Sequence, residues 1–192
     1  MTTIATENKF FDRFSITDIT LMSIIAAAFG ALAVYNQILT DLLRSVAGFY
    51  GGMIVAGIFP TAGIMAYALI RKRWVAFITM NVMGIAQILF GNPIGFLVLW
   101  FTVAHGIGQE LALFLFKYPK TGGDWRVWAL TGMASMLVVQ IPNVAIFGVG
   151  AMPLTSFVVP LVLIALPSSA ILPAVLTQAV VKIVPSGLLR RA

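Results

Sequence analysis

Long apolar runs alternate with short polar gaps along all 192 residues of the chain. A helix of about 20 mainly apolar residues crosses a hydrocarbon core of roughly 30 Å, and most runs are close to that length. The pattern predicts six membrane-spanning helices, near residues 19–38, 52–70, 74–90, 96–116, 126–147 and 157–183. We therefore expect an all-α integral membrane protein built as a compact six-helix bundle.

One membrane domain over residues 19–184 would follow a cytoplasmic or interfacial segment, 1–18, and precede a cytoplasmic tail, 185–192. Ser15 and Asp18 have the spacing of a capping box, in which the two side chains satisfy each other's backbone N–H groups. They are expected to begin the first helix, and Asp124 is expected to cap the fifth.

The positive charges indicate how the spans are oriented. Every Lys and Arg except Arg44 lies in alternate gaps between the runs, and the interior clusters are 71–73 and 117–126. Because positively charged loops stay in the cytoplasm, both chain termini are expected on that side of the cell membrane.

Composition narrows the classes of function. Only 9% of the residues are charged, against about 25% in soluble domains, and the mean hydropathy is +1.03. The basic residues lie at span ends, where they suit the headgroups of the lipid bilayer better than nucleic acid. The chain has no cysteine and a single histidine, and it has no paired carboxylates or catalytic triad pattern. We expect no metal site, no cofactor and no enzymatic activity.

Polar side chains gather in the outer halves of several predicted spans. A buried amide is costly unless it is hydrogen-bonded, so each one either joins two helices or lines a site. Their convergence at one depth, beside aromatic residues, favours an outward-facing pocket. The residues are Asn36, Gln37, Gln87, Asn92, Trp100, His105, Gln140 and Asn143.

Two ionisable residues of the fourth span each allow two interpretations. His105 either bonds to the protein backbone or contacts a bound molecule. Glu110 is either a hydrogen-bonded or Lys-paired group near the cytoplasm, or takes part in proton coupling. Their spacing of five residues places them about 140° apart around a helix, which disfavours an intramembrane enzyme that uses both.

Small residues form a smooth face on the first span. Ala26 and Gly30 are four residues apart, as are Ala27 and Ala31, and such spacing lets helices approach closely. The face serves either internal packing or contact with another membrane protein.

Several short motifs resemble a known family. They are Arg71-Lys72, Gly91-Asn92-Pro93, and the run 106–110 with the aromatic segment 114–118 after it. Together they are similar to the YkoE-type substrate-binding (S) components of energy-coupling factor (ECF) transporters, and the resemblance covers residues 15–185.

The resemblance implies a six-helix subunit that captures a vitamin or its precursor from outside. For the YkoE type the ligand would be thiamine or its hydroxymethylpyrimidine (HMP) precursor. Such a subunit docks on a membrane T component driven by two ATPase subunits, which hydrolyse the ATP. The implied pocket residues are Gln87, Asn92, Trp100, His105, Gln140 and Asn143, and the implied partner-docking residues are Ala26, Ala27, Gly30 and Ala31.

This chain departs from the pattern at two pocket positions. Relatives carry carboxylates near Gln87 and Asn143, where this chain has amides. Amides suit a neutral heterocycle such as an aminopyrimidine, whose edge offers donors and acceptors. The alternatives to a vitamin-binding subunit are a stand-alone secondary carrier or channel, and a membrane scaffold without a ligand.

Overall fold

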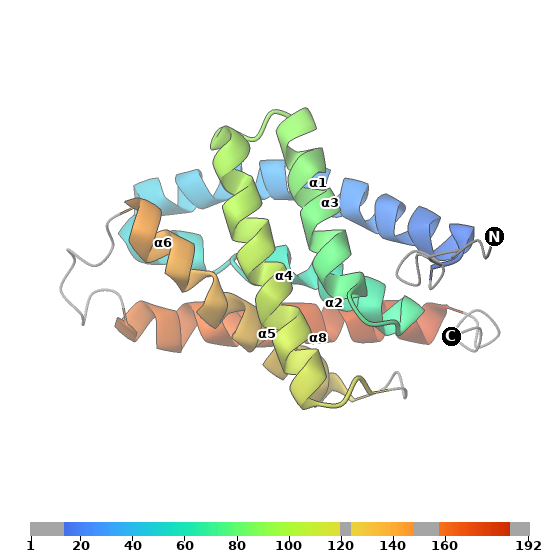
Figure 1. Ribbon diagram of the computed structural model, residues 1–192. Helices are drawn as coiled ribbons and strands as arrows, with labels where there is room; N and C mark the ends of the chain where they lie inside the picture. The colour runs from blue at the N-terminus through green and yellow to red at the C-terminus, as the bar shows by residue number, and fades with distance from the viewer. Residues whose placement is uncertain (1–13, 120–123, 148–157, 185–192) are drawn as a thin grey trace, which may run out of the picture.

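The computed structural model describes residues 14–119, 124–147 and 158–184, and within these ranges every regular element is helical. The elements are α1 (Ile16–Ala47), η2 (Gly48–Met53), α2 (Ile58–Ile70), α3 (Val75–Leu89), η3 (Gly95–Leu97), α4 (Val98–Leu115), α5 (Trp125–Val138), α6 (Gln140–Phe147), η5 (Leu161–Ala165) and α8 (Leu166–Ile183) (Figure 1). The predicted all-α class is confirmed. Most of the segment 1–18 and the tail 185–192 lie outside the described residues.

Five helical stretches are long and apolar enough to cross a membrane. They are Ile16–Ala47, Gly51–Ile70, Gly95–Leu115, Trp125–Ile146 and Val158–Ile183. The sixth apolar helix, Val75–Leu89, is shorter. A set of five long helices and one short helix agrees with a polytopic membrane bundle.

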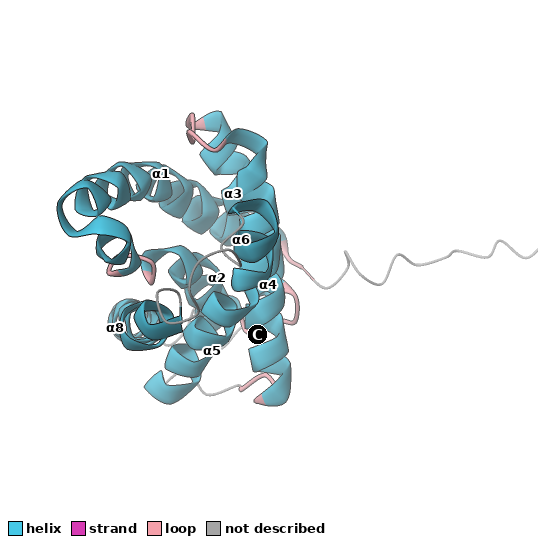
Figure 2. Ribbon diagram, turned by 90° about the vertical axis from the view of Figure 1, so that its left-hand side faces the viewer, coloured by secondary structure: helices cyan, strands magenta, loops and turns pink. Residues whose placement is uncertain are grey.

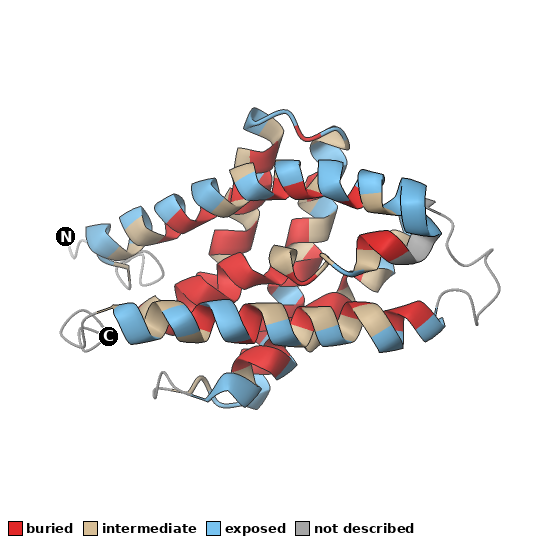
Figure 3. Ribbon diagram, turned by 180° about the vertical axis from the view of Figure 1, so that it is seen from behind, coloured by how far each residue is buried: buried red, intermediate tan, exposed pale blue. Residues whose placement is uncertain are grey.

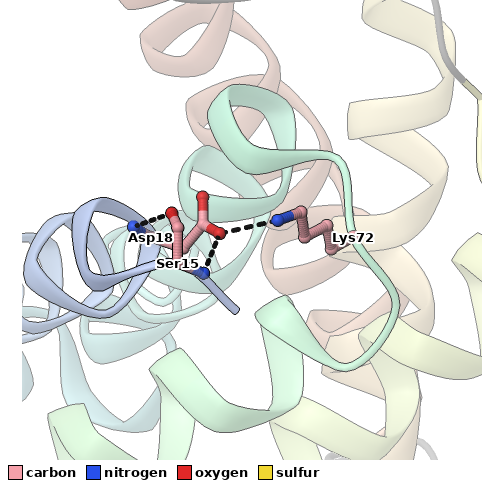
Figure 4. Close-up of polar contacts among 3 residues, drawn as sticks. All are labelled: Ser15, Asp18 and Lys72. Atoms are coloured by element: carbon pink, nitrogen blue, oxygen red, sulfur yellow. Dashed lines mark hydrogen bonds and ion pairs between the residues drawn. The ribbon is translucent and has the colours of Figure 1, made fainter. Parts of the chain in front are cut away.

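α1 begins with the predicted capping box (Figure 4). The Ser15 backbone N–H donates to Asp18 Oδ2 over 2.7 Å, and the Asp18 N–H donates to Ser15 Oγ over 3.1 Å. Asp18 Oδ2 also accepts from Lys72 Nζ at 2.7 Å, which ties the turn between α2 and α3 to the start of α1. The Arg73 guanidinium lies 5.1 Å from the Tyr118 ring centre, so the end of α4 lies there as well. The basic turn at 71–73 and the segment that follows α4 at Tyr118 therefore lie at the same end of the bundle.

α2 lies at the centre of the bundle. It packs against α1, α3, α4, α5 and α8, and most of its residues are buried. α1 and α8 run in opposite directions along one side of the molecule, and α4 lies on the other (Figures 1 and 2). Figure 3 shows that α1 and α8 each bury an inner face and expose an outer one. Large apolar residues cover the outer faces, as lipid contact requires.

Small residues set the closest helix contacts. A Cβ atom on Gly132 of α5 would collide with the Ser169 carbonyl oxygen of α8, and one on Gly108 of α4 would lie 2.7 Å from Ser135 Cα. On α1, a Cβ atom on Gly30 would lie 2.7 Å from Ala86 Cβ of α3. Close approach of this kind replaces the hydrophobic effect, which does not hold helices together within lipid.

Glu110 caps a neighbouring helix. Its carboxylate accepts from the Phe77 N–H in the first turn of α3 at 3.4 Å and from the Tyr118 hydroxyl at 3.0 Å. Burial, with the nearby Glu110 charge, raises the pKa of Tyr118 to about 12, so the phenol keeps its proton as donor. Trp74, before α3, provides no side-chain cap, and a carboxylate is favourable at a helix N-terminus. Of the interpretations offered for Glu110, the one in which its carboxylate is hydrogen-bonded therefore agrees with the structure.

Three helices differ from the predicted spans. α1 continues beyond residue 38 to Ala47, and along this extension Asp41 accepts from Gln37 at 3.2 Å and pairs with Arg44 at 3.7 Å. The fifth apolar run divides into α5 and α6 around Val139. The last run contains the π-helical turn η5.

We expect Gly132→Ala to destabilise the bundle, because its new methyl group meets a backbone carbonyl that cannot rotate away. Overpacking costs about 1–3 kcal/mol, so the midpoint of thermal unfolding in detergent should fall by roughly 2–12 °C. Leu130→Ala removes an exposed side chain from the same helix and should leave the midpoint nearly unchanged. Equal midpoints for the two variants would show that the contact between α5 and α8 is not tight.

Candidate functional site

A cavity of about 640 Å³ lies at the end of the bundle opposite the Asp18–Lys72 pair. Residues from all six apolar helices contribute to its wall. Those on the first three helical stretches and the following turn are Gln37, Thr40, Asp41, Arg44, Gly52, Met53, Ala56, Phe59, Met80, Gln87, Asn92, Pro93 and Ile94. The later ones are Val98, Phe101, Thr102, His105, Met136, Val139, Gln140, Asn143, Leu161 and Ala165. Such an apolar wall with a few amides is typical of a small-molecule site.

Five of the six implied pocket residues line this cavity, namely Gln87, Asn92, His105, Gln140 and Asn143, and Gln37 of the outer polar set lines it as well. Trp100 does not, and its side chain is 66% exposed on another face of α4. That the five contact a ligand remains a prediction.

Asn92 and Gln87 lock the turn that closes α3. The Asn92 N–H donates to the Gln87 carbonyl, and Asn92 Nδ2 donates to Gln87 Oε1, both over 2.9 Å. Asn92 Oδ1 accepts from the Ile94 N–H at 3.0 Å. Gly91 has φ +80°, which glycine adopts without strain. These bonds hold Gln87 in the wall and leave its Nε2 atom without a partner.

His105 belongs to a buried network between α4 and α5. Its Nδ1 atom lies 2.8 Å from Ser135 Oγ, and its ring stacks on Phe59 with 6.5 Å between centres. Gln109 Nε2 lies 3.3 Å from Ser135 Oγ and donates to the Pro60 carbonyl at 2.9 Å. These contacts fix the imidazole plane at the cavity wall.

The two amides on α6 form a short chain. Gln140 Nε2 donates to the Met136 carbonyl at 2.8 Å, and Asn143 Nδ2 donates to Gln140 Oε1 at 3.1 Å. The first bond spans the break between α5 and α6, and both amides belong to residues that line the cavity.

Sequence reasoning missed several wall residues. Thr40, Asp41 and Arg44 reach the cavity because α1 is longer than predicted. The charges on Asp41 and Arg44 were the available signal, since they are the only outward ones in the pattern. The π-helical turn contributes Leu161 and Ala165, and no local motif indicates it.

The segment between η2 and α2 is attached to the last helix. Ser168 Oγ donates to the Ile54 carbonyl at 2.6 Å and accepts from the Gly57 N–H at 3.1 Å. Gly57 needs to be glycine, because a Cβ atom there would collide with the Ser168 carbonyl oxygen. This attachment holds the cavity wall formed by Met53 and Ala56 against η5.

The predicted docking residues divide between two faces of α1. Ala26 is fully buried, and Gly30 packs against Ala86, so these two serve internal packing. Ala27 is exposed and Ala31 is half-buried. Any docking face on this part of α1 is therefore narrower than the four residues suggest.

We expect Asn92→Ala to loosen the turn after α3. The change leaves Gln87 Oε1 and the Ile94 N–H without partners, at about 1–3 kcal/mol, so the unfolding midpoint should fall by roughly 2–12 °C. Asn81 is a matched control, because its amide bonds only to the Phe77 carbonyl of its own helix. If Asn81→Ala destabilises the protein as much as Asn92→Ala, the turn network has no special role.

Three comparisons place the chain among known proteins. Residues 17–138 match the family described as the permease component of an ABC-type cobalt transport system. YkoE of Bacillus subtilis (strain 168), provisionally named an HMP/thiamine permease protein, is 28% identical over 170 residues, which are 87% of this chain and 82% of YkoE. A crystal structure described as an S-component of an ECF transporter superposes with a TM-score of 0.84 and 25% identity, over 92% of this chain and 88% of that one.

The predicted similarity to YkoE and to ECF S components is thus confirmed, and the chain is a multi-pass membrane protein. Because the family match spans more than half of its residues, the chain belongs to the family of ABC-type cobalt transport system permease components.

Proposed function

We propose that this protein is the substrate-binding membrane subunit of an ECF-type importer for HMP or thiamine. The observation that carries the proposal is the cavity of about 640 Å³, into which all six apolar helices place amide, aromatic and methionine side chains. Small-molecule sites have volumes of about 300–1,000 Å³. The similarity to YkoE and the shared S-component fold support the same role.

The charges of the cavity favour HMP over thiamine. Among the described wall residues the charged side chains are Asp41 and Arg44, which have opposite signs and lie 3.7 Å apart. Gln87 and Asn143 add neutral amides. A cation such as thiamine would meet a carboxylate whose charge Arg44 already balances, whereas a neutral aminopyrimidine needs no counter-charge.

The donor atoms in the wall also favour an organic ligand over cobalt. Divalent transition metals bind through several converging nitrogen, oxygen or sulfur donors. The described part of the chain contains no group of three His, Asp or Glu residues that could hold a metal ion. His105, which lines the cavity, is bonded to Ser135.

The proposed orientation places the basic end of the bundle in the cytoplasm. Lys72 and Arg73 lie at that end with the start of α1, and both chain termini are assigned to the same side. The cavity lies at the opposite end, so it would receive its ligand from outside the cell.

The partners proposed for uptake are a membrane T component and two ATPase subunits. The chain has no Gly-x-x-x-x-Gly-Lys motif, so ATP hydrolysis is assigned to these partners. Ala27 and Ala31 form the proposed docking face, because they are the members of the small-residue set that reach the surface of α1.

Calorimetric titration of the purified protein tests the ligand. HMP should bind at least tenfold more tightly than thiamine, and Gln87→Glu should narrow the difference by supplying an unbalanced carboxylate. Asn81→Asp places the same charge on α3 at a residue outside the cavity wall. It should not change the ratio of the affinities for HMP and thiamine. Binding of neither compound would contradict the proposal and favour a scaffold.

Ala27→Trp tests the docking face. The bulky side chain should block the partner without reaching the cavity, so HMP binding should persist while ATP-driven uptake into proteoliposomes falls at least tenfold. Ile171→Trp adds the same bulk at an exposed site on α8 and should transport normally. Loss of both binding and uptake in Ala27→Trp would exclude a simple docking role, and uptake without partner subunits would indicate a stand-alone carrier.

A further inference from the structure

We infer that two hydrogen-bond relays, each anchored on the backbone, fix the polarity of the cavity: Gln87 offers a donor and His105 offers an acceptor. The assignment of polarity depends only on the bonds within the protein. Its consequence for the ligand rests on the proposed function.

The first relay begins at the Ile94 N–H, which can only donate. It bonds to Asn92 at 3.0 Å, so the bonded side-chain atom is Oδ1 and the other atom is the donor Nδ2. Nδ2 lies 2.9 Å from Gln87, whose facing atom must then be the acceptor Oε1. The remaining amide nitrogen of Gln87 is a donor without a partner. A backbone group thus settles an orientation that an isolated amide leaves open.

The second relay begins at the Pro60 carbonyl, which can only accept. It bonds to Gln109 at 2.9 Å, so the bonded atom is Nε2, and this nitrogen directs a second N–H toward Ser135 Oγ at 3.3 Å. We assign the one proton of the Ser135 hydroxyl to the His105 carbonyl, which lies 3.1 Å away, rather than to His105 Nδ1.

The Ser135 oxygen is then an acceptor for the imidazole. In this arrangement His105 Nδ1, at 2.8 Å, carries a proton and donates it to Ser135 Oγ. A neutral imidazole has one N–H group, so His105 Nε2 is left as a bare acceptor. Because His105 lines the cavity, a bound molecule can use that acceptor.

The donor and the acceptor lie at different depths. Gly84 of α3 contacts Thr102 of α4, and Gly106 of α4 contacts Phe77 of α3, so the two helices are antiparallel. Gln87 lies three residues outward from the first contact and His105 three residues inward from it. At 1.5 Å per residue this separates them by about 9 Å along the helix axes.

A matching ligand therefore needs an acceptor at its outer end and a donor at its inner end. HMP meets this requirement, because its ring nitrogens and hydroxyl oxygen accept and its exocyclic amine donates. The polarity orients the amine toward His105 and an accepting atom toward Gln87. An orientation with a ring nitrogen toward His105 would place two acceptors together there.

Nitrogen NMR on protein labelled with [15N]histidine tests the polarity directly. His105 is the only histidine in the sequence, so a purification tag without histidine leaves one imidazole to observe. We expect a protonated Nδ1 and an unprotonated Nε2, and Ser135→Ala should abolish this preference. A protonated Nε2 in the unaltered protein would overturn the inference, whether or not the cavity binds a pyrimidine.

Binding of HMP and of its analogue without the exocyclic amine tests the orientation. The unaltered protein should bind HMP at least tenfold more tightly, and HMP should shift the Nε2 signal more than the Nδ1 signal. In His105→Phe, which keeps an aromatic ring against Phe59, the ratio of the affinities for HMP and for the analogue should approach one. An unchanged ratio in that variant would overturn the assigned orientation, whereas failure of both compounds to bind the unaltered protein would instead contradict the proposed function.

Discussion

The absence of water from the hydrocarbon core governs this structure, because each polar group there has to find its partner inside the protein. Glu110 meets the requirement by capping α3, and Ser135 meets it by joining α4 to α5. Exceptions at the cavity wall are Gln87 Nε2 and the Thr40 hydroxyl, which have no partner. Unpaired donors are costly in a packed interior but useful beside a cavity that receives a polar ligand. Unpaired groups also occur away from the cavity, among them Trp128 Nε1 and the Thr177 hydroxyl, so an unpaired group indicates a ligand contact only where it also lines the cavity.

The sequence predicted features that depend on neighbouring residues. The capping box at Ser15 and Asp18 and the cap at Asp124 follow from short motifs, and both are present. It did not predict the length of α1, since Asp41 and Arg44 look like the polar end of a span until their pairing on one helical face is known. The π-helical turn likewise depends on how η2 packs against it. Local motifs predicted where helices start, whereas helix ends and irregular turns depend on which side chains come together once the chain is folded.

The candidate site shows the same division. The depth of the site residues in the membrane could be predicted from the topology, and five of the proposed pocket residues lie at the cavity wall. Rotation about the helix axis was not taken into account, and Trp100 shows the consequence. The α4 residues at the wall are Val98, Phe101, Thr102 and His105, which are three or four apart and form one helical face. Trp100 lies five residues from His105, about 140° around the helix. Helical periodicity counted from His105 would have placed Trp100 on a different face from the α4 residues that line the cavity.

α1 connects the two proposed activities of the protein. Its inner face is fixed to α3 where Gly30 contacts Ala86, its start is fixed by the Asp18–Lys72 pair, and its far end supplies Thr40 to the cavity. Ala27 lies on the exposed side, between these attachments. Because the helix is continuous from Ile16 to Ala47, the cavity wall at Thr40 and the proposed docking residue Ala27 lie on one element, about 20 Å apart along its axis. Ligand and partner would therefore influence each other only if the helix as a whole takes two positions.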